Sequence, residues 1–316
     1  MGYSHHIAHF NTGLKAEEHL IGLLGRHHFL SGFRTYKKAL SEITTDVTKQ
    51  HPSAIDRPAY LDLYNQFGKG ESYREFLRGT TLFGVYEPFI PDGIEVNGQT
   101  LLMPYQAYTQ RYLNDWRYCP RCVEEDIEEG TMPFFRREHQ LPAMTLCHKH
   151  QERLLVLCKE CHQQDKELEK YSYPAGTTCK YCSCDLEPID SFVNTDILWV
   201  QQSMLRLMRG EVEILPLSEL KQLYQSQLGI TQYCGGFTVS GRNMNQLAQR
   251  DFDNYFDPRV FRALFNNCDG NASLKRPPAL NLHNVIFKEG VVFSPVVHLL
   301  IIRMLFGDID NIPSVS

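Results

Sequence analysis

The sequence has no long apolar run. The longest candidate, residues 299–306, carries Arg303 in its middle, whereas a bilayer-spanning helix needs about 20 apolar residues. The N-terminus contains His5, His6 and His9 but lacks the apolar stretch that a secretion signal requires. These absences predict a cytoplasmic protein with no membrane partner.

An excess of basic charge is missing as well. The formal net charge is -5, and it is unevenly distributed. Residues 1–118 sum to zero, residues 119–190 to -5 and residues 191–316 to zero. Proteins that bind nucleic acid unaided usually carry a strongly basic surface. The charge pattern therefore argues against strong DNA binding by this chain alone.

Catalytic motifs are absent too. The sequence contains no phosphate-binding G-x-x-x-x-G-K-[ST] loop and no H-E-x-x-H, and no H-x-E precedes Cys119 as it would in a zinc deaminase. An acidic run at 124–129 has the composition of a magnesium site, but such runs more often form a solvated helix face. The sequence thus predicts a protein that is not an enzyme.

Cysteine, in contrast, is plentiful and clustered. Eight of the ten cysteines lie between Cys119 and Cys184, and in a reducing compartment such clusters indicate metal ligands rather than disulfides. The other two, Cys234 and Cys268, stand alone and are interpreted as small buried apolar residues.

The second cysteine cluster has the spacing of a zinc ribbon. Cys158 and Cys161 form one C-x-x-C pair, Cys179 and Cys182 form another, and 17 residues separate the pairs. Four thiolates leave no open position on a tetrahedral ion, so this site is expected to be structural. Cys184, two residues beyond Cys182, is an alternative fourth ligand.

The first cluster combines Cys119 and Cys122 with Cys147 and a histidine. His150 suits the two-residue gap better than His148, and His162 is a weaker alternative. His139 is interpreted as a hydrogen-bonding core residue. Because only seven residues separate His150 from Cys158, the two sites are expected to be neighbours.

The flanking regions show helical patterns. Apolar residues at spacings of three and four predict two helices within 16–43, interrupted at Gly32, and a third at 60–67. Ser72 and Glu75 form a capping box for a fourth helix. Further helices are predicted around 197–207, 217–224, 252–256 and 296–306, with a loop at 276–278.

These patterns predict a mainly α fold with small zinc-ribbon β elements. We expect an N-terminal helical domain at 1–117, a tandem zinc-finger module at 118–190 and a C-terminal helical domain at 191–316. The N-terminal helices suit a helix-turn-helix, although the same pattern suits any small helical bundle.

The segment around the first cluster resembles the zinc-finger core of the TniQ/TnsD family of transposon target-site selection proteins. The resemblance rests on an ordered series of motifs: Tyr118-Cys119-Pro120-x-Cys122, Glu125-Asp126, Arg137-x-His139-Gln140-Leu141-Pro142 and Cys147-x-x-His150. Residues 81–89 and 298–306 look like segments of the TnsD branch.

Two features depart from the family pattern. Residues 10–15 replace the proline-rich, acidic start of the first helix, and TnsD proteins are longer. The chain is therefore either a shorter homologue or an N-terminal portion of one.

The resemblance implies a specific role and ligand set. Such proteins mark target DNA, alone or through a CRISPR effector complex, and recruit a TnsC-type AAA+ ATPase that licenses the transposase. The resemblance also places two structural Zn²⁺ ions on eight residues: Cys119, Cys122, Cys147 and His150, then Cys158, Cys161, Cys179 and Cys182.

Partners are expected to supply much of the DNA affinity, because the chain lacks a basic footprint. Five residues are candidates for phosphate contacts: Lys37, Lys38, Arg121, Arg136 and Arg137. A zinc-ribbon helix-turn-helix transcription regulator is the main alternative. A zinc-dependent hydrolase or nuclease is a remote one, because it needs an open metal position.

Overall fold

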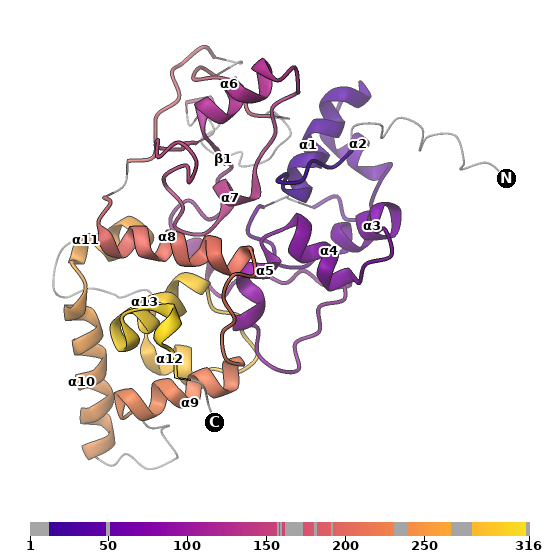
Figure 1. Cartoon of the computed structure of the whole chain (residues 1–316). Helices are drawn as coiled ribbons and strands as arrows, with labels where there is room; N and C mark the ends of the chain where they lie inside the picture. The colour runs from indigo at the N-terminus through magenta and orange to yellow at the C-terminus, as the bar shows by residue number, and fades with distance from the viewer. Residues whose placement is uncertain are drawn as a thin grey trace. The chain divides into compact units, whose positions relative to one another are not determined.

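A computed structural model describes most of the chain (Figure 1). The described residues are 13–48, 51–156, 158, 160–161, 173–179, 182–190, 192–230, 239–266 and 280–313. The predicted loop at 276–278, His162, Cys234 and Cys268 lie outside them. The described part is mainly helical with one small two-stranded sheet, which confirms the predicted fold class.

The chain forms two compact units. Unit 1 comprises Met1–Leu82, Val96–Leu102 and Asn114–Asp190, and unit 2 comprises Phe83–Glu95, Met103–Leu113 and Ser191–Ser316. This grouping does not separate residues 118–190 from the N-terminal helices. The three-domain division at 117/118 and 190/191 stays a prediction.

Unit 1 begins with four helices whose ends follow from local sequence. They are α1 (Leu20–Ser31), α2 (Tyr36–Ser41), α3 (Pro58–Phe67) and α4 (Tyr73–Thr80). Gly32 ends α1 with a φ of 70°, a left-handed conformation that glycine adopts freely. The predicted capping box is present, because Ser72 and Glu75 each bond to the other's backbone N–H at the start of α4.

The remainder of unit 1 consists of short elements: β1 (Arg117–Tyr118), α6 (Pro120–Glu128), α7 (Arg137–Gln140) and β2 (Leu155–Val156). The strands pair antiparallel, with Arg117 opposite Val156. Backbone bonds join this part to α1, since the His19 N–H donates to the Phe135 carbonyl (2.9 Å) and the Arg137 N–H to that of Glu17 (2.9 Å).

Unit 2 surrounds one apolar helix. Its elements are α5 (Phe83–Tyr86), η2 (Glu87–Phe89), η3 (Ala107–Thr109), α8 (Thr195–Met208), α9 (Leu217–Leu228), α10 (Val239–Tyr255), α11 (Pro258–Leu264), α12 (Leu282–Phe287), α13 (Pro295–Phe306) and η5 (Ile309–Asn311). Residues 295–302 of α13 are all buried, as expected for a helix that is apolar on every side. Figure 1 shows α13 among the other helices of this unit.

Unit 2 departs from the sequence prediction in two ways. The early segments 83–95 and 103–113 belong to it, and the Arg111 N–H donates to the Leu264 carbonyl (2.9 Å). Tyr255 falls within the apolar helical pattern predicted around 252–256, yet it is 51% exposed and so lies on the solvent side of α10. No helix in the described part of the chain is long and apolar enough to cross a membrane.

Candidate metal centre

The first two ligand candidates lie where β1 meets α6. Cys119 is the residue before α6, Pro120 occupies the first helical position, and Cys122 completes the first turn. Proline suits this position because it has no N–H to leave unpaired. The helical turn points both thiols the same way, and both are buried.

A tight hairpin supplies the other two ligand candidates, Cys147 and His150. The Cys147 N–H donates to the Glu152 carbonyl and the Gln151 N–H to the Cys147 carbonyl, each over 2.8 Å. Gln151 has a φ of 57°, which reverses the chain direction. His150 therefore lies in the turn, facing the same space as Cys147.

The four side chains meet at distances that suit a metal ion. Nδ1 of His150 lies 3.3 Å from Sγ of Cys119 and 3.4 Å from Sγ of Cys122. Sγ of Cys147 lies 3.7 Å from both Sγ of Cys122 and Nδ1 of His150. A tetrahedral zinc ion separates two sulfurs by about 3.8 Å and a sulfur from a nitrogen by about 3.6 Å. The donor set and its spacing thus fit zinc.

The second cluster repeats the hairpin. The Cys179 N–H donates to the Cys184 carbonyl and the Ser183 N–H to the Cys179 carbonyl, each over 2.8 Å. Ser183 has a φ of 59°, matching Gln151. Cys182 occupies the turn position that His150 has in the first hairpin, and Cys184 occupies that of Glu152.

The second hairpin and the Cys158–Cys161 pair form another group of four. Sγ of Cys158 lies 3.6 Å from that of Cys182, and Sγ of Cys161 lies 3.4 Å from that of Cys179. All four ligand atoms lie within 4.8 Å of one another. Cys184 stays outside this group, because its backbone pairs with Cys179 and its Sγ faces the Cys182 carbonyl.

Disulfides do not account for either cluster. None of the eight described cysteines forms a disulfide. Hydrogen bonds from the Cys119 and Cys122 thiols, with backbone N–H groups of the hairpin, lower the pKa of Cys147. Both groups can hold a metal ion, and their chemistry is compatible with zinc.

A carboxylate orients the histidine of the first group. Oε1 of Glu125 lies 3.0 Å from Nε2 of His150, and Lys149 donates to Oε2 over 2.7 Å. These two bonds lower the pKa of Glu125 to about 2, so the carboxylate is charged and accepts the Nε2 proton. Nδ1 of His150 is then left with its lone pair facing the thiols.

The neighbouring acidic residue holds the loop after α6. Asp126 accepts two hydrogen bonds from Arg136, of 3.0 and 2.8 Å, and both side chains are buried. Its carbonyl accepts from both the N–H (2.8 Å) and the hydroxyl (3.0 Å) of Thr131. Within the acidic run, Glu124, Glu128 and Glu129 are exposed as predicted. Glu125 and Asp126 are not, because they support the site.

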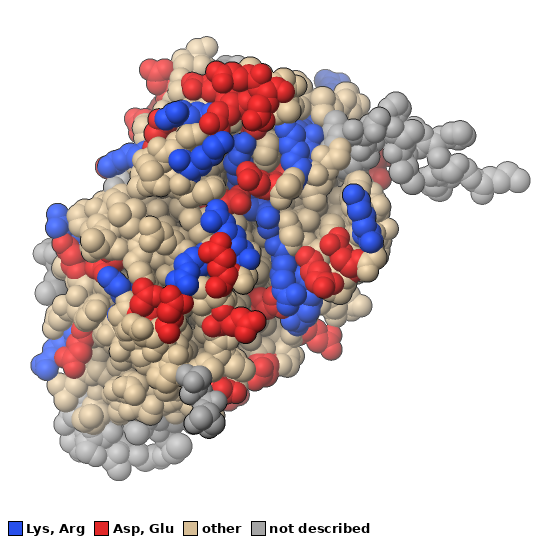
Figure 2. Space-filling model, viewed as in Figure 1, with Lys and Arg blue, Asp and Glu red and all other residues tan. Residues whose placement is uncertain are grey.

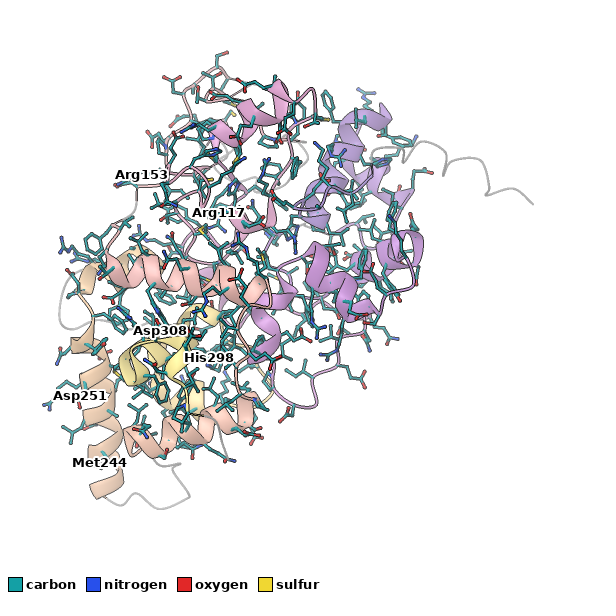
Figure 3. All side chains as sticks on the ribbon, in the orientation of Figure 1. Arg117, Arg153, Met244, Asp251, His298 and Asp308 are labelled. Atoms are coloured by element: carbon teal, nitrogen blue, oxygen red, sulfur yellow. The ribbon has the colours of Figure 1, made fainter. Side chains whose placement is uncertain are left out.

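Gln140 joins α7 to β1. Its side chain accepts from the Arg117 N–H (3.0 Å) and donates to the Arg117 and Arg136 carbonyls (2.7 and 3.0 Å). Arg117, labelled in Figure 3, is fully buried and donates to the Met144 carbonyl. The Arg-x-His-Gln segment therefore fixes the strand from which Cys119 follows.

The predicted DNA-contacting residues differ in their exposure to solvent and in the contacts that they make within the protein. Lys37 and Lys38 are exposed, and Arg121 is 56% exposed but lies 3.6 Å from Glu152. Arg137 is half-buried and donates to the Arg78 carbonyl over 2.8 Å. Arg136 is buried against Asp126 and stacks on the Phe134 ring (4.3 Å).

The surface around α6 is acidic. Figure 2 shows carboxylates gathered over this helix, with lysine and arginine side chains bordering them and scattered over the rest of the same face. This agrees with the negative charge of residues 119–190. This charge disfavours a phosphate backbone near α6, so the exposed lysines of α2 are stronger candidates for DNA contacts than Arg121 of α6.

Comparison with known proteins gives one family. Residues 10–154 match the family model TniQ. The matched region contains α1 to α4 and the whole first metal group, and it ends before the second. A search of curated proteins gave no match.

Proposed function

We propose, from the TniQ domain that the chain carries over residues 10–154, that this protein is a target-site adaptor of DNA transposition. A TniQ domain implies a role in transposition target selection and belongs to non-enzymatic adaptors. In the finer proposal, the protein marks target DNA and recruits a TnsC-type AAA+ ATPase, which licenses the transposase to insert there. The observation that carries the proposal is the family match together with the assembled first metal group.

The proposal assigns two structural zinc ions. One is held by Cys119, Cys122, Cys147 and His150, and the other by Cys158, Cys161, Cys179 and Cys182. Four protein donors at each site leave no position for a water nucleophile. This donor count supports an adaptor and argues against a zinc hydrolase or nuclease.

DNA contact is proposed for the exposed basic residues of unit 1. Lys37 and Lys38 project from α2, and no acidic residue occupies the first turn of that helix. Arg121 is a further candidate, because its ion pair is long and solvent-exposed. Arg136 is not retained as a contact, since moving it would leave the buried Asp126 unpaired.

The testing experiment is a DNase footprint on DNA from the host's insertion locus. The purified protein is used alone, then with the AAA+ ATPase, then with a CRISPR effector complex if the element encodes one. Protection by the protein alone makes it a direct reader of DNA. Protection that needs a partner makes it an adaptor with borrowed specificity. No protection in any combination, with targeted insertion unchanged when the gene is deleted, overturns the proposal.

The paired variant Lys37→Ala/Lys38→Ala tests the surface. A plot of log K for DNA binding against log salt concentration has a negative slope. Each lost phosphate contact should reduce the magnitude of that slope by about one. Lys69→Ala is the matched control, because Lys69 is an exposed lysine of unit 1 outside α2. An unchanged salt slope in the paired variant would remove α2 from the DNA-binding surface.

A further inference from the structure

A buried histidine lies directly behind the first metal group. His139 belongs to α7 and is 1% exposed, and its Nε2 lies 4.0 Å from Sγ of Cys122. Both flanks of α7 are fixed, because the Arg137 N–H bonds the Glu17 carbonyl and Gln140 bonds β1. The fold therefore presents this imidazole to one particular thiol.

The surroundings of His139 indicate which ring nitrogen carries a proton toward the thiol. Nδ1 has no hydrogen-bond partner among the described residues, whereas Nε2 faces the sulfur. The proton is best placed on Nε2, where the thiol sulfur can accept it.

We propose that His139 is a positioning residue of the first metal group, which donates its Nε2–H to the Cys122 thiolate once the metal is bound. This proposal rests on the zinc assignment made above. A hydrogen bond to a charged acceptor is stronger than a neutral one, and it withdraws charge from the sulfur. The thiolate should then exchange its metal more slowly and react more slowly with alkylating agents.

His139 as a ligand is the competing role. His139, Cys147 and His148 also place one ligand atom each within 4.8 Å of one another. However, Cys147 already belongs to a complete set of four, and Glu125 orients His150 to be its fourth member. The geometry therefore places His139 outside the coordination sphere.

The second metal group provides an internal reference. Cys161 and Cys182 are half-buried, while all three thiols of the first group are buried. Zinc transfer to a chromogenic chelator should therefore proceed in two phases, with the faster phase from the second group. An effect of His139 must appear in the slower phase alone.

The experiment measures zinc transfer from the full-length protein by stopped flow. His139→Phe removes the donor, and His139→Gln restores one at the position of Nε2. Outer-shell partners contribute roughly 10–100-fold to metal affinity, so the phenylalanine variant should accelerate the slow phase by about that factor. The glutamine variant should return toward the native rate, and His148→Ala should match the native protein.

Substituting cobalt for zinc gives a spectrum that depends on the thiolate's hydrogen bond. The spectrum should not change if His139 acts only through packing. Without its hydrogen bond the thiolate is easier to oxidise, so the thiolate-to-cobalt charge-transfer band should shift to lower energy in His139→Phe and recover in His139→Gln. His139→Asn, whose amide lies nearer the backbone, should fail to recover it even if every variant loses some stability.

Two results would overturn the proposal. Equal rates and spectra for the phenylalanine, glutamine and asparagine variants would show that only ring packing matters. Loss of a nitrogen ligand from the cobalt spectrum of His139→Phe, but not of His150→Ala, would make His139 the ligand instead. Neither measurement involves DNA or an ATPase, so both outcomes are independent of the adaptor function.

Discussion

Neighbouring carboxylates on α6 have different partners. Glu125 bonds His150 and Lys149 beside the metal group, whereas Asp126 is buried against Arg136. Sequence pattern treats both as part of a solvated acidic run. One signal separates them: they follow Cys122 by three and four residues, so they share its helix face. The long-range partners that define their roles come from elsewhere in the chain, beyond the reach of local pattern.

A buried histidine in unit 2 has no hydrogen-bond partner for its ring among the described residues. His298, labelled in Figure 3, lies fully buried on α13, stacked on Phe89 (4.6 Å) and Tyr224 (6.2 Å). Neither ring nitrogen has a hydrogen-bond partner among the described residues. Burial, with a smaller contribution from Lys221, lowers the pKa of His298 to about 3. The native protein therefore keeps this ring neutral in mildly acidic solution.

Acid should destabilise unit 2 through this residue. Below its usual pKa of about 6.5 the unfolded chain takes up a proton at His298 and the native chain does not. Stability should therefore fall as pH drops from 6.5 to 5, by up to about 1.4 kcal/mol per pH unit. His298→Leu should flatten this dependence.

The measurement uses denaturant unfolding followed by Trp199 fluorescence in a Trp116→Phe background. The chain has two tryptophans, and Trp199 is the one in unit 2. The control is His283→Gln, because burial also lowers the pKa of His283, which is only half-buried. An equal slope with and without His298 would mean that another group governs acid sensitivity.

At the scale of elements, the two metal hairpins depend on one backbone conformation. Gln151 and Ser183 each have a φ near +58°, 57° and 59° respectively. Polar residues tolerate this region at modest cost, whereas β-branched residues do so poorly. The hairpin therefore constrains the residue after each turn ligand, although neither residue contacts metal.

Ser183→Val should weaken the second metal group. The valine disfavours the left-handed conformation by roughly 1–2 kcal/mol, which corresponds to about 10-fold in zinc affinity. Ser183→Gly should bind zinc as well as the native protein. Competition with a calibrated chelator measures both, and equal affinity for valine and glycine would contradict the assigned hairpin geometry.

Helices with strong local signals could be predicted from sequence. Periodicity located α1, α3, α8, α9 and α13, and the capping box marked the start of α4. Periodicity does not reveal short helices such as α5 and α7, because a helix of four residues is too short to show a repeating pattern. Spacing also predicts the cysteines that form the two groups, whereas the family resemblance, not spacing, selects His150 and Cys182 as the fourth members. The hairpin that separates Cys184 from the second group depends on backbone pairing, which local pattern does not show.

At the scale of the whole molecule, metal should stabilise one unit selectively. Both ligand groups belong to unit 1, where they replace part of an apolar core. Chelation should therefore unfold the part of unit 1 around Trp116 while the Trp199 signal of unit 2 persists. Parallel denaturation of Trp116→Phe and Trp199→Phe variants, with and without chelator, measures this.

Single ligand changes should remove one of the two zinc ions. Cys161→Ser and Cys179→Ser should each lose about one equivalent of zinc and unfold the central module, because structural zinc supplies folding free energy. Cys184→Ser is the matched control, since Cys184 lies in the same hairpin but outside the ligand group. Unchanged thermal stability and zinc content in the ligand variants would show the assignment to be wrong.

The interleaving of the two units also affects biosynthesis. Phe83, Val85 and Tyr86 of α5 are buried in unit 2, where α5 packs on α8. Roughly a hundred residues separate these helices along the chain. A ribosome adds about 5–20 residues per second, so the apolar face of α5 stays uncovered for on the order of 5–20 s before α8 is synthesised. Nascent chains should therefore be most vulnerable to chaperone capture in that interval, after α5 emerges and before α8 does.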